Sequence, residues 1–364
     1  MTVKEITKIL EELAPLATAE DFDNVGLLVG NYNMEVSGVL VTLDTLETVV
    51  EEAIEKNCNL IVSFHPILFA PLKKLNGSDY VQRVVIKAIA NQIAIYSMHT
   101  ALDNSIRGVN AKICEVLQIR DPKILIPRSG TIKKLTTYAP VKVAQQVKEA
   151  LFAAGAGEIG NYTHCSYSLE GLGSFKAGNG ANPTLGKIGE LHHERETQIN
   201  VIYSFDRQGQ ILKALFDAHP YEEVAHEVVT LENANQDLGM GMVGTLEREW
   251  DEREFLLWVK QRMGAAVVRH SPLLGKKVGR VAVLGGSGAF AIPEAIKAGA
   301  DILITSDLKY HQFYQAEGKL LIADIGHFET ERFTKDLLHA HLTKKIPNFA
   351  VVLSERITNP INYL

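Results

Sequence analysis

The sequence contains little cysteine, no long apolar run and no excess of basic residues. Its three cysteines, Cys58, Cys114 and Cys165, are far apart and show no C-x-x-C spacing, which argues against a disulfide framework and a thiolate zinc site. No apolar run is long enough to span a bilayer, and the first residues lack the apolar stretch of a secretory signal. With a formal net charge of −6 and no basic cluster, a nucleic-acid partner is not expected. These absences predict a cytoplasmic protein with no membrane partner.

The length and composition predict a globular α/β protein with more than one domain. A chain of 364 residues exceeds the size at which one hydrophobic core stops growing, so two or three domains are expected. Hydrophobic residues make up 46% of the chain and charged residues 22%, which is typical of a globular protein.

Two stretches that lie far apart in the chain resemble each other. The segments "EEAIEKNCNLIVSFHP" (51–66) and "PEAIKAGADILITSDL" (293–308) each predict a helix, a turn and a buried strand that ends at a polar loop. Each follows another apolar strand, "GVLVTLD" in the first case and "RVAVLGG" in the second. The pattern is that of β-α-β units in a largely parallel sheet, and its recurrence predicts a duplicated fold. Chance similarity between two common units is the alternative.

A second similarity follows each of these units. "IAIYSMHTALD" places His99 and Asp103 after a strand, and "LLIADIGHFETE" places His327 and Glu331 after another. Ligands of open α/β sheets bind beyond the carboxyl ends of the strands, so we expect these side chains to converge. If a helix begins near His327, the spacing of four puts His327 and Glu331 on one face, where both can bind zinc, iron, manganese or nickel. The alternatives are a solvated polar pair on a helix and, for Asp103, a helix N-cap.

Two further segments at strand ends are candidates. In "SFHPILF", His65 follows an apolar strand and precedes Pro66, which prevents the strand from continuing. A histidine in this place suits metal ligation or proton transfer, and a hydrogen-bonded structural role is the alternative. "GGSG" (285–288) lies between a strand and a helix and could bind an anion through backbone N–H groups, although it lacks the lysine and spacing of a P-loop.

The middle of the chain predicts a different fold. From residue 127 to residue 245 the order is strand, helix, strand, strand, helix, strand, which is that of a ferredoxin-like α+β unit. We therefore expect an inserted domain at 127–245 and two α/β halves of one core at 1–126 and 246–364.

Two polar motifs of this insert are predicted to have no catalytic role. In "AHPYEEV", His219, Glu222 and Glu223 could form another metal site, but a structural or oligomer-forming role is favoured. The pair His192 and His193 is expected in solvent.

Six motifs together resemble the Nif-three-like family, whose members are also labelled GTP cyclohydrolase I type 2 homologues. In chain order they are "FDNVGLLVG", "SFHPILF", "YSMHTALDNSIRGVN", "VAVLGGSGAF", "LITSDLKYHQF" and "IGHFETE". The insert is similar to the CutA-like domain of the longer bacterial members. The resemblance implies a toroidal homohexamer with a pair of metal ions between the two halves of each subunit.

The resemblance also implies a set of metal ligands, which are His65, Asp103, His327 and Glu331. The family usually has two adjacent histidines before the proline, and Phe64 stands where the first of them is expected. One ion would take the two histidines and the glutamate, a sound set for a divalent metal such as zinc, iron or manganese.

The second ion would keep only Asp103 and the shared Glu331. That site is therefore expected to bind more weakly or to use a substitute ligand such as His99, so one or two ions are expected in each subunit.

A metal pair predicts hydrolysis of a small molecule. Two divalent ions about 3.5–4 Å apart can activate a bridging water, and the GTP cyclohydrolase label is one specific proposal for the reaction. His99, Asp307, Lys309 and His311 are candidates for orienting ligands or moving protons, with surface solvation as the alternative for Lys309. The competing hypothesis is a non-catalytic, metal-binding or regulatory hexamer.

Overall fold

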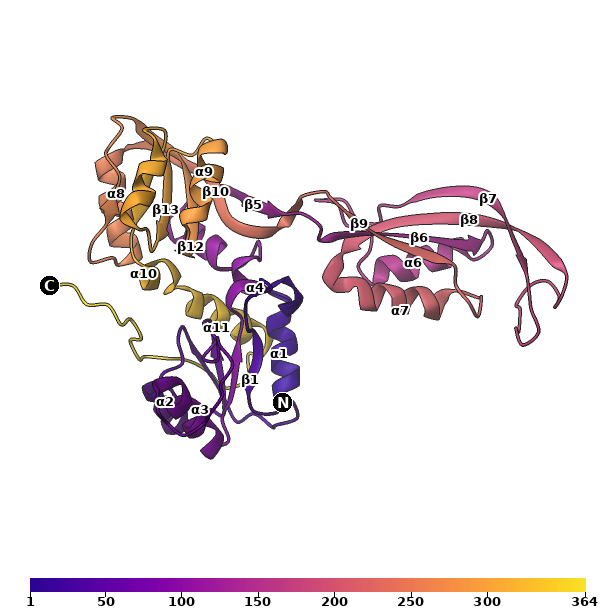
Figure 1. Cartoon of the computed structure of the whole chain (residues 1–364), viewed down its shortest axis with the longest axis horizontal. Coiled ribbons are helices and arrows are strands. Elements are labelled where there is room, and N and C mark those ends of the chain that lie inside the picture. The colour runs from indigo at the N-terminus through magenta and orange to yellow at the C-terminus, as the bar shows by residue number, and fades with distance from the viewer. The chain divides into compact units, whose positions relative to one another are not determined.

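The structure is a computed structural model that describes residues 1–364, and the chain forms two compact units (Figure 1). The first unit comprises Met1–Pro127 and Asp237–Leu364, and the second comprises Arg128–Gln236. The boundary expected at residue 245 falls inside one continuous strand, β10 (Asn235–Asp251). No helix is both long enough and apolar enough to cross a membrane.

The first unit has mixed α/β structure. Its strands are β1 (Gly26–Val29), β2 (Val39–Thr42), β3 (Leu60–Ser63), β4 (Ala94–Ser97), β5 (Arg120–Arg128), β10, β11 (Arg269–His270), β12 (Lys277–Ser287), β13 (Ile302–Ser306), β14 (Leu321–Asp324) and β15 (Val351–Leu353). Its α-helices are α1 (Val3–Glu11), α2 (Glu47–Glu55), α3 (Tyr80–Ala90), α4 (His99–Asp103), α5 (Val109–Val116), α8 (Glu252–Met263), α9 (Ile292–Lys297), α10 (His327–Glu331) and α11 (Thr334–Lys345). Short 3-10 helices are η1 (Leu16–Thr18), η3 (Ala289–Ala291) and η4 (Tyr310–Ala316).

The strands of this unit form two sheets with a common arrangement. The first sheet has the order β1-β4-β3-β2-β15 and the second has the order β11-β14-β13-β12-β10-β5. In the first, β2, β3 and β4 are parallel and β1 is antiparallel to β4. In the second, β12, β13 and β14 are parallel and β11 is antiparallel to β14. The C-terminal strand β15 pairs in parallel with β2, so the end of the chain completes the first sheet.

Alternation along the buried strands divides the core into layers. In β13, Ile302 and Ile304 face a hydrophobic cluster that side chains of both sheets share, whereas Leu303 faces a second cluster under α9 and η4. In β3, Ile61 likewise packs beneath α2 and α3, which cover one face of the first sheet (Figure 1). Because both faces are covered, these strands are continuous apolar runs.

The second unit contains the predicted order of strands and helices. Its elements are β6 (Ile132–Pro140), α6 (Ala144–Ala153), β7 (Tyr167–Lys176), β8 (Leu191–Ser204), η2 (Phe205–Arg207), α7 (Gln208–Ala218) and β9 (His226–Leu231). The sheet order is β7-β8-β6-β9, and all neighbours are antiparallel. Figure 1 shows α6 and α7 side by side, and both contribute to the hydrophobic cluster of this unit.

The "AHPYEEV" motif lies just after α7 and supports local structure. His219 is buried, and its Nε2 is 2.9 Å from the backbone oxygen of Tyr138. Glu222 accepts a hydrogen bond from the backbone N–H of Asn182 at 2.8 Å and so holds the loop between β7 and β8. His192 is half-buried against Phe175 rather than fully solvated.

One buried carboxylate ties the C-terminal segment to α2, which leads to the first prediction. Glu52 accepts hydrogen bonds from the Ser354 hydroxyl and from the backbone N–H of Glu355, at 2.9 Å in the second case. We predict that Glu52→Ala lowers the free energy of unfolding by about 1–3 kcal/mol, because a buried donor loses its acceptor. Urea denaturation measures the change. Glu55→Ala removes an exposed ion pair with Arg356 on the same helix and should cost less than about 1 kcal/mol. Equal losses in the two variants would contradict this account.

Candidate metal centre

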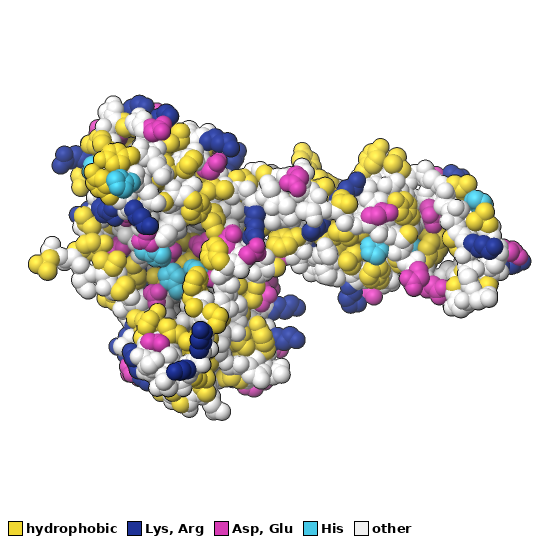
Figure 2. All heavy atoms as spheres, viewed as in Figure 1, with side chains coloured by type: hydrophobic (Ala, Val, Ile, Leu, Met, Phe, Trp, Pro, Cys, Tyr) yellow, Lys and Arg dark blue, Asp and Glu magenta, His cyan; other side chains and the backbone are white.

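Two histidines lie just beyond the carboxyl ends of buried strands from different sheets. His65 follows β3, and its backbone N–H donates to the backbone oxygen of Leu43 at 3.0 Å, which fixes the turn. His327 begins α10, shortly after β14 ends at Asp324. Figure 2 shows histidine and carboxylate side chains gathered in a hollow of this unit.

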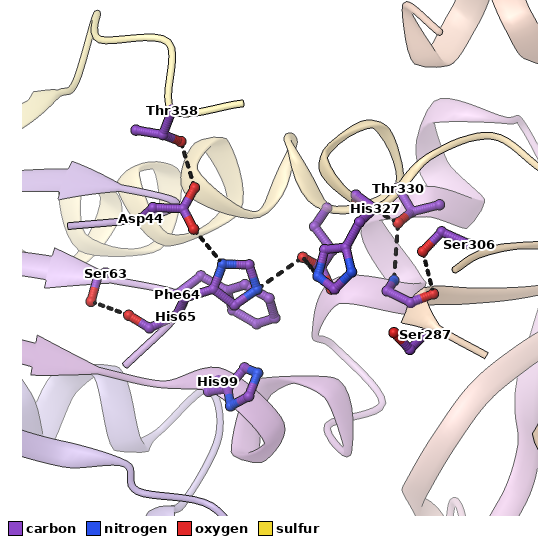
Figure 3. Close-up of polar contacts among 12 residues, drawn as sticks. Asp44, Ser63, Phe64, His65, His99, Ser287, Ser306, His327, Thr330 and Thr358 are labelled. Carbon is purple, nitrogen blue, oxygen red and sulfur yellow. Dashed lines mark hydrogen bonds and ion pairs between the residues drawn. The ribbon is translucent and has the colours of Figure 1, made fainter. Parts of the chain in front are cut away.

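Glu331 brings the two histidines into one cluster. Its Oε2 atom is 3.0 Å from Nε2 of His65 and 3.0 Å from Nε2 of His327. The ligand atoms of these three residues all lie within 4.8 Å of one another, and the close-up in Figure 3 shows the two rings pointing toward each other. The same oxygen is buried and faces these two ring nitrogens. Two imidazoles and one carboxylate could therefore hold a divalent metal and leave positions open.

A second carboxylate orients each histidine. Nδ1 of His65 is 2.7 Å from Oδ1 of Asp44, and Nδ1 of His327 is 2.7 Å from Oδ2 of Asp307. A proton held on Nδ1 by these carboxylates leaves Nε2 free to bind a cation. Asp44 also accepts a hydrogen bond from the Thr358 hydroxyl (Figure 3).

The carboxylates give the site a strong preference for positive charge. Burial lowers the pKa of His65, but Asp44 and Glu331 outweigh it and raise that pKa to about 10. Burial also lowers the pKa of His327, whereas Glu331 and Asp307 raise it to about 9. Burial raises the pKa of Glu331, but the two imidazoles lower it to about 2. The positive charge that stabilises the Glu331 carboxylate can come from protons on the two histidines or from a bound divalent cation.

The "GGSG" segment has a different role from the anion cradle that its sequence suggested. The backbone N–H of Gly285 donates to Asn110 at 3.0 Å, and that of Gly286 donates to the Thr330 hydroxyl at 2.9 Å. Two of its N–H groups are therefore already used within the protein. Gly286 instead has φ +69°, and a Cβ there would lie 2.4 Å from Oε1 of Glu331. The absence of a side chain makes room for the buried carboxylate.

Phe64 and His99 lie beside the cluster. The Phe64 ring is fully buried, with its centroid 4.9 Å from that of His65 and 5.5 Å from that of His99. Nδ1 of His99 is 2.7 Å from Oδ1 of Asp23, whose other oxygen accepts from the backbone N–H of Thr100 at 3.0 Å. Asp23 thus orients His99 as Asp44 orients His65.

The remaining predicted residues are not in the cluster of three. Asp103 ends α4, and its Oδ1 atom is buried without a hydrogen-bond partner. Burial and the nearby Glu331 carboxylate raise the pKa of Asp103 well above its usual range. Lys309 and His311 are exposed at η4, where His311 packs against Tyr310.

Of the side chains that hold the histidines, sequence reasoning named Asp307 but missed Asp44 and Thr358. Asp44 directly follows the buried strand in "GVLVTLD", so the strand-end argument that found His65 could also have found it. Thr358 gave no local signal, because only the tertiary fold brings the C-terminal segment to Asp44.

The fold and the cluster define an α/β protein with a candidate metal centre between two sheets. The family model described as Duf34/NIF3 (NGG1p interacting factor 3) matches residues 1–360, and the chain belongs to this family. The resemblance found in the sequence motifs is thereby confirmed.

Relatives match over almost the whole chain. The GTP cyclohydrolase 1 type 2 homolog of Bacillus subtilis strain 168 is 37% identical over 367 residues, which cover 99% of this chain and 98% of that protein. The solved structure of a Bacillus cereus protein related to NIF3 is 36% identical, with a TM-score of 0.88 over 100% of this chain and 99% of that one. A Staphylococcus aureus protein, SA1388, is 27% identical with a TM-score of 0.80 over the same shares.

The raised pKa values of the two histidines lead to a prediction of pH dependence. Both histidines hold protons in the folded chain at pH values where unfolded histidine has lost them. In the presence of a chelator, stability should therefore fall as pH rises from about 6.5 to about 10. Urea denaturation at a series of pH values measures the slope. Glu331→Gln removes the carboxylate that both rings share and should flatten it. An unchanged slope in this variant would show that the pairing contributes nothing.

Proposed function

We propose that this protein is a divalent-metal-dependent hydrolase of a small molecule, with the ion held by His65, His327 and Glu331. The observation that carries the proposal is the convergence of two Nε2 atoms on one buried carboxylate oxygen, with all ligand atoms within 4.8 Å of one another. A bound zinc, iron or manganese ion would supply Lewis-acid chemistry for hydrolysis. Three protein ligands leave coordination positions open, as in catalytic rather than structural sites.

The residues around the cluster have distinct roles in this proposal. Asp44 and Asp307 hold the Nδ1 protons and fix both rings. His99, oriented by Asp23, can exchange a proton with a substrate through its free Nε2. Lys309 and His311 can act only on a substrate that reaches η4, because neither contacts the cluster.

The family resemblance and the topology support proposals for the assembly and for the origin of the domains. The common strand order of the two sheets supports a duplicated β-α-β core. The antiparallel order of the second unit supports a ferredoxin-like, CutA-like insert. We propose a homohexamer on the basis of the family resemblance. The name of the Bacillus subtilis relative makes GTP a substrate to test, alongside other small phosphate esters and amides.

The second candidate function is a non-catalytic metal-binding or regulatory hexamer. Phe64, which has no ligand atom and stands where the family usually has a histidine, favours it. Both functions require the same ion at the same three residues. Turnover of a substrate is therefore the property that distinguishes them.

Removal of the shared carboxylate tests both the site and the reaction. We predict that Glu331→Gln weakens Mn²⁺ binding by more than about 100-fold. Loss of a residue that only orients a ligand reduces affinity by up to about 100-fold, and loss of a direct ligand should reduce it further. Calorimetric titration measures the affinity, and a panel of phosphoesters, amides and GTP measures turnover. Glu329→Gln is the matched control. Glu329 is also buried on α10, but its carboxylate accepts a hydrogen bond from Asn359 at 3.4 Å and is not part of the cluster of three. A Glu331→Gln protein that still hydrolyses at the wild-type rate would exclude this site from the reaction. An ion-loaded wild type without turnover would favour the non-catalytic function.

A glycine substitution tests the position of the carboxylate without removing it. We predict that Gly286→Ala weakens Mn²⁺ binding by at least about tenfold, because the new Cβ displaces Glu331. Gly299→Ala is the control: its φ is also +69°, but nothing lies within 4 Å of the added atom. Both variants pay the same backbone cost of about 1–2 kcal/mol. Equal affinities in the two variants would contradict the proposed packing.

A further inference from the structure

We propose that each chain of this protein holds a single divalent ion, and that Phe64 closes the neighbouring position to a second. The inference rests on the proposed ion at His65, His327 and Glu331. It departs from the pair of ions that the family resemblance implies. The residues at the neighbouring position, which are Phe64, Asp103 and His99, do not fit a second metal site, as three observations show.

The first observation is the packing of Phe64. Its side chain is fully buried and belongs to the hydrophobic cluster that also contains Tyr96 and Met98. The ring carries no lone pair that could bind a cation. The backbone is also fixed, because the Phe64 carbonyl accepts from the Ser97 hydroxyl at 2.6 Å and from the N–H of His99 at 2.9 Å. An ion at this position would have to displace a close-packed ring.

The second observation is the isolation of Asp103. Its Oδ1 atom is buried and has no hydrogen-bond partner, so it is available to a ligand. However, the only group of histidine, cysteine and acidic residues with ligand atoms within 4.8 Å is His65, His327 and Glu331. A second ion would therefore have Asp103 and the shared Glu331 as its protein ligands.

The third observation concerns His99, the candidate replacement for the missing histidine. Its Nδ1 atom is held by Asp23 at 2.7 Å, so only its Nε2 atom could act as a ligand. Its ring meets Phe64 edge-on, at an interplanar angle of 74°, and also meets the His65 ring, with 5.4 Å between the centroids; Figure 3 shows His99 beside these two side chains. His99 therefore belongs to no cluster of three ligand atoms with Asp103.

The position next to the proposed ion therefore has hydrogen-bonding groups and an apolar ring in place of a set of metal ligands. It offers the buried Asp103 carboxyl group and the free Nε2 of His99, beside an apolar ring. These groups can hydrogen-bond a polar substrate that reaches the ion. Hydrolysis in this protein would then use one ion, rather than an ion pair that bridges the attacked group.

The number of ions that each chain retains tests the proposal. Wild type, Phe64→His and Phe64→Leu are loaded with Mn²⁺ alone, desalted and analysed for manganese and protein. We expect about one ion per chain in wild type and in Phe64→Leu. We expect about two in Phe64→His, because the imidazole supplies the missing ligand. Phe64→Leu is the matched control, because it changes the ring but adds no ligand. Electron paramagnetic resonance of the same samples should show coupled Mn²⁺ spins in Phe64→His alone.

Asp103→Asn in both backgrounds gives a second test that does not depend on the folding of Phe64→His. In wild type the substitution should leave the ion count unchanged, whereas in Phe64→His it should remove the gained ion. About two ions in wild type, or loss of an ion in the Asp103→Asn single variant, would overturn the single-ion proposal and leave the metal-dependent function standing. Wild type without any retained ion would instead refute the proposed function itself.

Discussion

The site depends on one interaction, the approach of the buried Glu331 carboxylate to two imidazole nitrogens at 3.0 Å each. A buried charge is costly unless it is paired, so the fold must supply both partners at once. The partners come from different sheets, and His65 and His327 each bring a carboxylate that fixes the ring. The cluster is therefore also a link between the two halves of the core, and a cation at this place would serve folding as well as chemistry.

Several features of the fold can be understood as supports for this interaction. Parallel strands in both sheets bring their carboxyl ends, and hence both histidines, to one place. Gly286 leaves room for the carboxylate, where any side chain would collide with it. The C-terminal segment, held by Glu52, carries Thr358 to Asp44 and so reaches the second layer of the site. A side chain at Gly286 would displace the Glu331 carboxylate, whereas a change at Thr358 would act on the cluster through Asp44 and the His65 ring.

The sequence predicted the parts of this arrangement that have a local signal. His65 follows a buried apolar strand, and the spacing of His327 and Glu331 places both on one helical face, so pattern made them candidates and the family resemblance joined the three in one ligand set. The β-α-β units of the first unit and the order of strands and helices in the second were accessible for the same reason. What the sequence could not show depends on contacts between distant segments: the pairing of β15 with β2, and the Asp23 carboxylate against His99. The possible anion cradle at "GGSG" is also a matter of tertiary contacts, because Asn110 and Thr330 take two of its N–H groups.

The most direct test of the central claim is the position of a bound ion. Crystals of the wild-type protein soaked with Mn²⁺ would be measured at a wavelength where manganese scatters anomalously. The account predicts one strong peak per chain, within about 2.0–2.2 Å of Nε2 of His65, Nε2 of His327 and Oε2 of Glu331. A peak that lacks these three atoms as ligands, or no peak in the hollow between the two sheets, would contradict it.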